Sequence, residues 1–235
     1  MTLRIIGAGP LAEQARRLAD AAGMAVVSSD ADYILPATED DGTLKALAGE
    51  NVLFDAAAWA IASSRLKSDA LLREHGIPAP AYFPGGSEPY IVKPDRGGFG
   101  LGIWVTDDYC EVGGAVNAGF VTQEELSGDV WSVAVTGTPG SYTAHPAARL
   151  TFDDGRHRTD AVCEPAPEAE LLAKTAIDAA EAVGVHGVLE VEAIFDGGVW
   201  KVTDLNARLP MLTSDALLSA CGVNLLTELI RVYEG

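Results

Sequence analysis

The stretch "GVLEVEAIFDGGVWKVTDLNARLP", residues 187–210, most narrows the folds open to this chain. Two segments of alternating apolar and polar residues flank the turn residues 196–198, "DGG". This combination is a strong signal for a β-hairpin, in which two antiparallel strands are joined by a tight turn. The chain is therefore expected to contain an antiparallel or mixed sheet that is built around this hairpin.

The polar residues of the hairpin occur in step with the strand period. Side chains alternate between the two faces of a strand, so Glu190 and Glu192 share one face of the first strand, and Asp204 and Asn206 share one face of the second. With a three-residue loop at 196–198, Glu190 faces Asp204, Glu192 and Asp204 are diagonal neighbours, and all four side chains lie on one face. A two-residue loop would turn the acids to opposite faces. Two carboxylates and an amide oxygen on one face suit Mg²⁺, which takes further ligands from water and substrate phosphates; a solvated hairpin face is the alternative.

A glycine-rich stretch, "KPDRGGFGLG" at residues 93–102, lies between two short apolar segments that read as strands. Glycines let backbone N–H groups converge on an anion, and Lys93 supplies a positive charge. The stretch is not a Walker loop, because the lysine precedes the glycines and a strand follows them. Alone it fits a hairpin turn or a linker equally well. Since the hairpin acids need phosphates to complete a metal shell, we interpret it as a lid over a phosphate-bearing ligand.

The rest of the chain predicts alternating strands and helices. Residues 1–55 read as a small α/β unit with parallel strands. A helix is expected between Ser63 or Ser64 and Gly76, and an alanine-rich helix over 168–183. The polar segment 150–166 is expected to be a long loop.

Composition limits the partners of the chain. It has 235 residues, 48% of them hydrophobic, and a formal net charge of −18, which disfavours binding to nucleic acid or to an anionic membrane. Three widely spaced cysteines without a CxxC motif argue against a disulfide scaffold and against structural zinc. No stretch approaches the ~18 apolar residues of a membrane span, and no signal peptide is recognisable. We expect a cytoplasmic protein.

In order and spacing, Lys67, "YIVKP", "DRGGFGLG", "TQEEL" and "EVEAIF…KVTDLNAR" resemble the ATP-grasp superfamily of ATP-dependent carboxylate-amine ligases, over residues 50–230. "VLFDAAAWAIASSRLKSDALLREHGIPAP", "GVLEVEAIF" and "GVNLLTELI" are most similar to its pyrrolysine-biosynthesis branch, the 3-methylornithine–lysine ligases. The resemblance implies an α/β ATP-grasp fold in which two α+β lobes clasp ATP. It places a shortened Rossmann-like N-terminal lobe at 1–55, a small lobe with the glycine loop at 56–122, and a large lobe with the metal site at 123–235.

The resemblance also implies roles for individual residues. Catalytic roles fall to Lys93 and Arg208, and the metal ligands would be Glu192, Asp204 and Asn206. The ATP phosphates would meet Lys67, Lys93, Gly97, Gly98, Gly100 and Gly102, whereas adenine and ribose would lie near Gln123, Glu124, Leu126 and Asp129. Residues expected near the amino-acid substrate are Glu39, Arg149, Arg158, Asp160 and Glu190.

The implied reaction is amide-bond formation between amino-acid-like substrates through an acyl phosphate, with release of ADP. It would use ATP and Mg²⁺, with two ions expected and Mn²⁺ as a substitute, and small-molecule amino acids or amines as partners, in a monomer or a homodimer. An amine–glutamate ligase of the tyramine–glutamate type, from methanofuran-like cofactor biosynthesis, is the alternative within the family.

Two other function classes stay open. "GAGPLA" followed by Asp30 fits the dinucleotide-binding fingerprint, which would suit an NAD-dependent oxidoreductase. A non-catalytic, regulatory ATP-binding homologue is the other, although loss of the metal acids would be its mark, and these acids are present.

Overall fold

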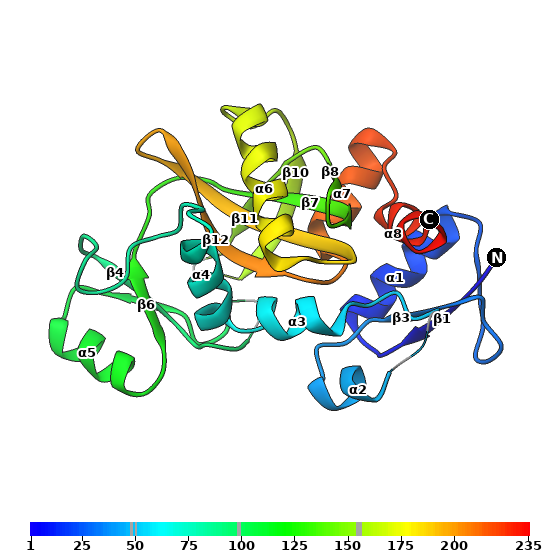
Figure 1. The fold of residues 1–235 in the computed structure, drawn as a ribbon, viewed down its shortest axis with the longest axis horizontal. Coiled ribbons are helices and arrows are strands. Elements are labelled where there is room, and N and C mark those ends of the chain that lie inside the picture. The colour runs from blue at the N-terminus through cyan, green and yellow to red at the C-terminus, as the bar shows by residue number, and fades with distance from the viewer. Residues whose placement is uncertain (48, 50, 98–99, 154–156) are drawn as a thin grey trace.

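The computed structural model describes residues 1–47, 49, 51–97, 100–153 and 157–235. Within them the strands form three sheets, which follow one another along the long axis of the molecule (Figure 1). Both termini lie at the same end, beside the N-terminal sheet.

The N-terminal sheet is parallel, as the sequence predicts. Strand β1 (Thr2–Ile6) lies between β2 (Ala25–Val26) and β3 (Tyr33–Pro36), and both pair with it in parallel. Helix α1 (Pro10–Ala21) follows β1, with Pro10 in its first turn, and a short helix α2 (Asp41–Ala46) follows β3. These elements form the small α/β unit expected at the start of the chain.

The smaller of the two antiparallel sheets has the order β5–β4–β6. Strand β4 (Tyr90–Lys93) lies in the centre, and β5 (Trp104–Thr106) and β6 (Val121–Glu124) lie at the edges. Helix α5 (Tyr109–Asn117) packs beside this sheet. The glycine-rich stretch joins β4 to β5. Lys93 is the last residue of β4, so the start of this stretch is fixed by the sheet.

The large antiparallel sheet has the order β10–β9–β7–β11–β12, in which β11 spans Gly187–Asp196 and β12 spans Val199–Asn206. Strand β8 (Ser141–Ala144) pairs with β7 (Val130–Thr138). Strands β9 (Ala148–Phe152) and β10 (Arg158–Cys163) form its outer part, so the prediction of a long loop over 150–166 is wrong. The reason is exposure: β10 has no fully buried residue and carries charged side chains, so the apolar alternation that marks a strand is missing.

Helices cover both faces of the large sheet. On one face, α6 (Ala169–Val183), α3 (Ala56–Ala62) and α4 (Arg65–Glu74) pack over side chains such as Leu189 and Val191. On the other face, α7 (Met211–Cys221) and α8 (Leu225–Glu234) pack against Val188 and, through a shared core, against α1 and the N-terminal sheet. The large sheet and the N-terminal unit therefore share one hydrophobic core.

Local helix signals proved reliable. Ser64 caps α4 by accepting a hydrogen bond from the backbone N of Lys67 at 3.3 Å, and Gly184, with φ 69°, ends α6. The division into three lobes stays a prediction. Helices α3 and α4 pack on the large sheet although they belong to the predicted small lobe, and β6 crosses the predicted boundary at residue 122.

No single helix within the described ranges is both long and apolar enough to cross a membrane. Among the helices of the described residues, α7 and α8 reach that length and composition when taken together, and a bend of 99° separates them.

The register of the central hairpin differs from the predicted one. Strands β11 (Gly187–Asp196) and β12 (Val199–Asn206) are joined by two residues, Gly197 and Gly198, whose φ angles of 58° and 84° suit the tight turn that favours glycine. The three-residue loop is therefore wrong. A register shift inserts Thr203 as an extra residue, so that Glu192 pairs with Asp204.

The bulge at Thr203 has a decisive consequence. The extra residue moves Asp204 and Asn206 to the face of the sheet that carries Glu190 and Glu192. Beyond the bulge, Glu190 pairs with Asn206 directly across the ladder. The two-residue turn alone would have placed the acids of the two strands on opposite faces. The expectation that all four polar side chains share a face is thus correct, but through a bulge and not through the loop length.

Candidate active site

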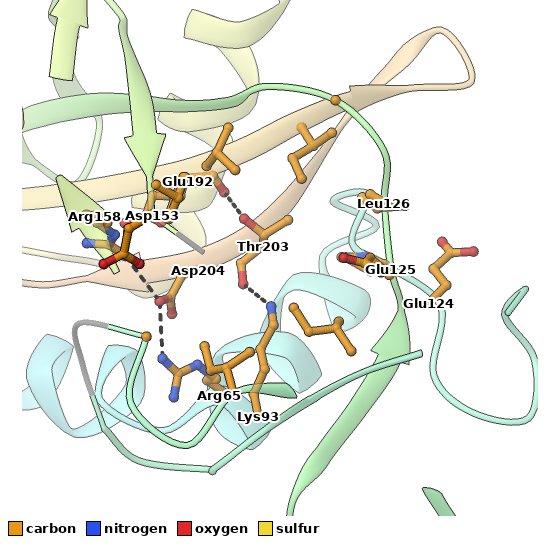
Figure 2. A pocket seen from close by; sticks show the side chains of 18 residues that line it. Arg65, Lys93, Glu124, Glu125, Leu126, Asp153, Arg158, Glu192, Thr203 and Asp204 are labelled. Carbon is orange, nitrogen blue, oxygen red and sulfur yellow. Dashed lines mark hydrogen bonds and ion pairs between the residues drawn. The ribbon is translucent and has the colours of Figure 1, made fainter. Parts of the chain in front are cut away.

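A cavity of about 430 Å³ lies between the β5–β4–β6 sheet and the large sheet. Its walls come from β4, from the segment Glu124–Leu126 that leaves β6, and from the β11–β12 hairpin. Figure 2 shows Glu124, Glu125 and Leu126 at one end of this cavity and Glu192, Asp204 and Arg158 at the other. The cavity is therefore elongated, with a backbone segment at one end and charged side chains at the other.

The four polar residues Glu190, Glu192, Asp204 and Asn206 form what we call the acid face of the hairpin. Arg158, from β10, lies against it: its guanidinium forms an ion pair with Glu192 and lies 3.7 Å from Asp204 Oδ2 and 3.9 Å from Glu190 Oε2. Asn206 Nδ2 donates to Glu190 Oε2 at 3.2 Å and to Glu192 Oε1 at 3.3 Å. One arginine thus contacts all three carboxylates of the acid face.

Glu190 occupies the closed end of the acid face. Its Oε1 accepts hydrogen bonds from Ser132 Oγ on β7 at 2.9 Å and from Thr213 Oγ1 on α7 at 3.1 Å. The carboxylate is 3% exposed, and it does not line the cavity as far as the described residues show. Glu190 therefore ties two strands and a helix together.

Two cations lie below the acid face. Lys93 Nζ donates to the backbone O of Thr203, the bulge residue, at 3.2 Å. Arg65 Nη2 lies 3.4 Å from Asp204 Oδ2, and its Nη1 donates to the backbone O of Pro94 at 2.8 Å. Its Nε is buried without a hydrogen-bond partner in the described part of the chain. This nitrogen is therefore a buried donor whose hydrogen bond is unsatisfied among the described residues.

Burial and neighbouring charges set the ionisation of these groups. Burial raises the pKa of Glu192 to about 8, although Arg158 opposes the shift. Burial would also raise the pKa of Asp204, but the charges of Arg65, Arg158 and Lys93 outweigh it and hold that pKa below its ordinary value. Burial lowers the pKa of Lys93. Of Glu192 and Asp204, Glu192 is thus the acid whose charge is less well compensated by its neighbours.

A second cavity, of about 250 Å³, lies where the hairpin meets the N-terminal unit. It shares Arg65 and Asp204 with the first cavity, so the two cavities meet at the acid face. The rest of its wall includes Glu39, Asp40, Trp59, Ser63, Arg96, Gly97 and Asn206. Arg208 donates through Nε to Glu39 Oε1 at 3.0 Å beside this cavity.

Most of the predicted site residues are brought together. Those that line the first cavity are Lys93, Gly100, Glu124, Leu126, Arg158, Glu192 and Asp204, and those that line the second are Glu39, Gly97 and Asn206. Glu190 and Arg208 lie directly behind these walls through the contacts given above.

Other predicted residues lie elsewhere. Lys67 and Asp129 are exposed, and Gly102 is exposed beside Pro94. Gln123 is buried and donates to Asp69 Oδ1 at 2.9 Å, so its amide does not face the cavity.

Two residues predicted to lie near the amino-acid substrate also have other partners. Arg149 forms an ion pair with Glu164, and the exposed Asp160 accepts from the backbone N of Ala161. They belong to strands β9 and β10, not to a loop. Gly98 lies outside the described residues.

Arg65 is the main residue that sequence reasoning missed. It stands two residues before Lys67, directly after the cap residue Ser64, and is 9% exposed. The first turn of the helix therefore points Arg65 into the site and Lys67 into solvent. The available signal was an arginine directly after the cap residue, but only the packing of α4 on the hairpin shows that it is buried and where it points.

The sequence of the chain is similar to that of curated proteins of named activity. No protein-family model matches the chain. A curated relative, a 3-methyl-D-ornithine–L-lysine ligase of Methanosarcina acetivorans, is 30% identical over 213 residues, which are 88% of this chain and 58% of the relative. The chain thus spans somewhat over half the length of the curated relatives it matches.

Two solved structures show the fold. Biotin carboxylase from Campylobacter jejuni, in a β,γ-ATP complex, superposes with a TM-score of 0.81 at 17% identity over 100% of this chain and 71% of that one. The L-amino acid ligase from Bacillus licheniformis gives a TM-score of 0.72 at 16% identity over 98% of this chain and 73% of that one. The chain thus has the fold of these structures, the ATP-grasp fold, and is similar in sequence to a relative that is named as a ligase.

Proposed function

We propose that the chain is an ATP-dependent ligase that joins a carboxylate to an amine, with release of ADP and phosphate. The observation that carries this proposal is the pairing of Glu192 with Asp204 at the end of an elongated cavity that also contains Lys93 and Arg65. We place adenine against the backbone of Glu124–Leu126 and the phosphates at the acid face, because the cations lie there.

The donor set fits magnesium that arrives with a nucleotide. Two carboxylates and the amide oxygen of Asn206 are hard ligands of the kind Mg²⁺ takes. In the described ranges, no group of three or more His, Cys, Asp or Glu side chains is arranged to hold an ion alone. Phosphate oxygens would therefore complete the shell, and the number of ions stays a prediction.

The balance of charges in the site also supports the binding of the metal ion together with the nucleotide. The three carboxyl groups of the acid face lie among three cations, those of Arg65, Lys93 and Arg158, so the cluster carries no surplus of negative charge. A bare divalent ion would leave this buried cluster with an excess of positive charge, whereas a nucleotide that carries the ion also brings negative phosphates. We therefore propose that metal and ATP bind together.

Arg158 has to change partners when they do. Its guanidinium contacts the same carboxylate oxygens that a metal ion would use, so the two cannot occupy the acid face together. Because Arg158 also lines the cavity, it can exchange these acids for an oxygen of the phosphate or of the substrate carboxylate. In this proposal Arg158 stabilises the acid face before binding and contacts the reacting groups afterwards.

The chemistry needs no nucleophilic side chain. A carboxylate is a poor electrophile, so transfer of a phosphoryl group would first give an acyl phosphate, which an amine then attacks to give the amide and phosphate. The metal would supply charge stabilisation at the phosphates. Lys93 and Arg65 would hold charge on the transferred group, and the glycine-rich segment would exclude water from the acyl phosphate.

The second cavity suits an amino-acid substrate. Its wall presents the acids Glu39 and Asp40 together with the cation Arg96, and amino acids carry both of the opposite charges. The name of the Methanosarcina relative pairs 3-methyl-D-ornithine with L-lysine. We therefore propose a pyrrolysine-pathway-like coupling of amino acids. A cytoplasmic location of the protein stays a prediction, and so does its state as a monomer or a homodimer.

The oxidoreductase alternative has less support. Gly7 occupies the fingerprint turn after β1, but a Cβ at Gly7 would collide with the backbone O of Ala37, the residue that follows β3. The close approach of the two strands therefore accounts for this glycine without a dinucleotide. Asp30 is exposed in a left-handed turn.

Turnover tests the proposal directly. The protein is incubated with ATP, Mg²⁺ and a panel of amino acids and amines, and ADP and phosphate are quantified while mass spectrometry identifies the product. We expect amide product with at least one pair that includes a diamino acid, and none from an Asp204→Asn variant. Intact ATP binding without turnover of any pair would instead support a regulatory ATP-binding protein.

A further inference from the structure

Two of the three cysteines of the chain meet in the folded protein. Cys163 Sγ and Cys221 Sγ are 3.4 Å apart, although the residues are 58 positions apart in sequence. Cys163 ends β10 and is partly buried, whereas Cys221 ends α7 and is exposed. Helix α7 packs against β10, which brings the ends of both elements together. The third cysteine, Cys110, is exposed on α5, beside another sheet.

This contact has no counterpart in the sequence pattern. The spacing contains no CxxC motif and argues against a disulfide scaffold. A disulfide bond has a length of about 2.05 Å, so closure needs the sulfur atoms to approach by little more than ~1 Å. The folded protein therefore holds the two thiols close to bonding distance and keeps one of them open to reagents.

We propose that Cys163 and Cys221 form a dithiol site that closes to an intramolecular disulfide by exchange with small-molecule disulfides. In the first step the Cys221 thiolate attacks a disulfide R–S–S–R, forms a mixed disulfide and expels one RS⁻. In the second step Cys163 loses its proton, attacks the sulfur of Cys221 and expels the second RS⁻. Two protein thiols and one R–S–S–R thus give one protein disulfide and two RSH.

The environment of each thiol fixes the order of the steps. Burial, with the neighbouring Cys221, raises the pKa of the Cys163 thiol to about 11, so Cys163 is slow to react with a reagent in solution. Cys221 is exposed and is therefore the entry point. Once Cys221 is modified, Cys163 lies next to the sulfur it must attack, which favours closure over a stable mixed disulfide.

The bridge would join two elements that support the acid face. Strand β10 begins with Arg158, which pairs with Glu192, and α7 carries Thr213, which donates to Glu190. A disulfide between their far ends would fix this strand on this helix. In a reducing compartment the pair is a dithiol, and the bridge forms only under oxidation. The site does not depend on the proposed ligase activity.

Intact-mass spectrometry tests the closure. The folded protein is treated with the aromatic disulfide dithiobis-nitrobenzoate, which leaves a thionitrobenzoate group on each isolated cysteine. We expect the wild type to retain one group, on Cys110, and to lose two hydrogens at the pair, with a Cys163–Cys221 peptide found after digestion. The matched Cys110→Ser variant should retain none, and Cys163→Ser should retain a group on Cys221. Retention of groups on both Cys163 and Cys221, or no reaction of either in the folded protein, would overturn the proposal.

Thermal unfolding provides an independent readout. The bridge closes a loop of the chain, so the oxidised wild type should melt several degrees higher than the reduced protein, and dithiothreitol should reverse the shift. The oxidised Cys110→Ser variant should show the same shift, whereas Cys221→Ser should show none. An equal shift in Cys221→Ser would contradict the assignment.

Discussion

Two carboxylates of one strand, Glu190 and Glu192, end up in different environments. At the inner end of the acid face, Glu190 is satisfied by neutral donors, the hydroxyls of Ser132 and Thr213. At the cavity end, Glu192 is held by the Arg158 guanidinium and borders open space. Both residues are almost fully buried and share the same face. Since residue type and spacing are equal, the partners from β7, α7 and β10 decide that one acid is held inside the fold and that the other borders the cavity.

The largest effect is expected at the cavity end. Asp204→Asn removes a proposed metal ligand while it keeps the size of the side chain, so turnover should fall by ~10²-fold or more. Phosphate release at saturating ATP measures it. Asp160→Asn on the exposed β10 strand is the matched control and should keep wild-type activity. An active Asp204→Asn variant would count against the metal site.

The next effect concerns the cation of the cavity end. Arg158→Gln leaves the acid face without the cation that contacts all three carboxylates, so the free energy of unfolding of the nucleotide-free protein should fall by about 3 kcal/mol. Denaturant titration measures this loss. In a Glu192→Gln background the same change should cost clearly less, because the ion pair between Arg158 and Glu192 is already absent there. Equal losses in both backgrounds would show that Arg158 acts independently of Glu192.

Lys93→Ala should weaken ATP binding about 10- to 100-fold, because the variant loses a buried cation at the proposed phosphate end of the cavity. Titration calorimetry with Mg²⁺ and a non-hydrolysable ATP analogue measures the affinity. Lys67→Ala is the control on the neighbouring helix. Lys67 is exposed, so its removal should change the affinity by no more than ~2-fold. The reverse ranking of the two lysines would contradict the placement of the phosphates.

The smallest effect separates the two glutamates themselves. Glu190→Gln should lower the free energy of unfolding by about 1–2 kcal/mol, because an amide cannot accept from all the donors that surround this position. Glu192→Gln should not lower it at pH 7–8, since a pKa raised to about 8 means that burial already disfavours the charged form. Urea unfolding of the two metal-free variants tests the contrast. An equal loss of stability in both would remove the distinction between the two ends.

Local sequence signals sufficed for much of the fold. A cap at Ser64 and glycines at 76 and 184 set the limits of α4 and α6, and the first strands pair in parallel as their apolar runs predict. These signals depend on neighbours within a few residues. They fail for β9 and β10, which are stabilised by pairing with each other and with β7 and not by an apolar pattern of their own.

Side-chain direction was the harder part of the site. Arg65 and Lys67 stand in one helical turn, and only the packing of α4 on the hairpin turns Arg65 inward. In the same way the two-residue turn, read alone, predicts a divided acid face, and the bulge at Thr203 reverses that result. Each case requires knowledge of a partner that is distant in sequence.

By itself, the sequence determined the composition of the site: three acids and an amide in step on one hairpin, a lysine before a run of glycines, and an order of motifs that resembles one superfamily. Tertiary structure decided which of those groups face one another, that Arg158 covers the acids, and that Cys163 meets Cys221. The physical reason is that periodicity fixes the face of a strand or helix, whereas register, bulges and packing fix what lies opposite that face.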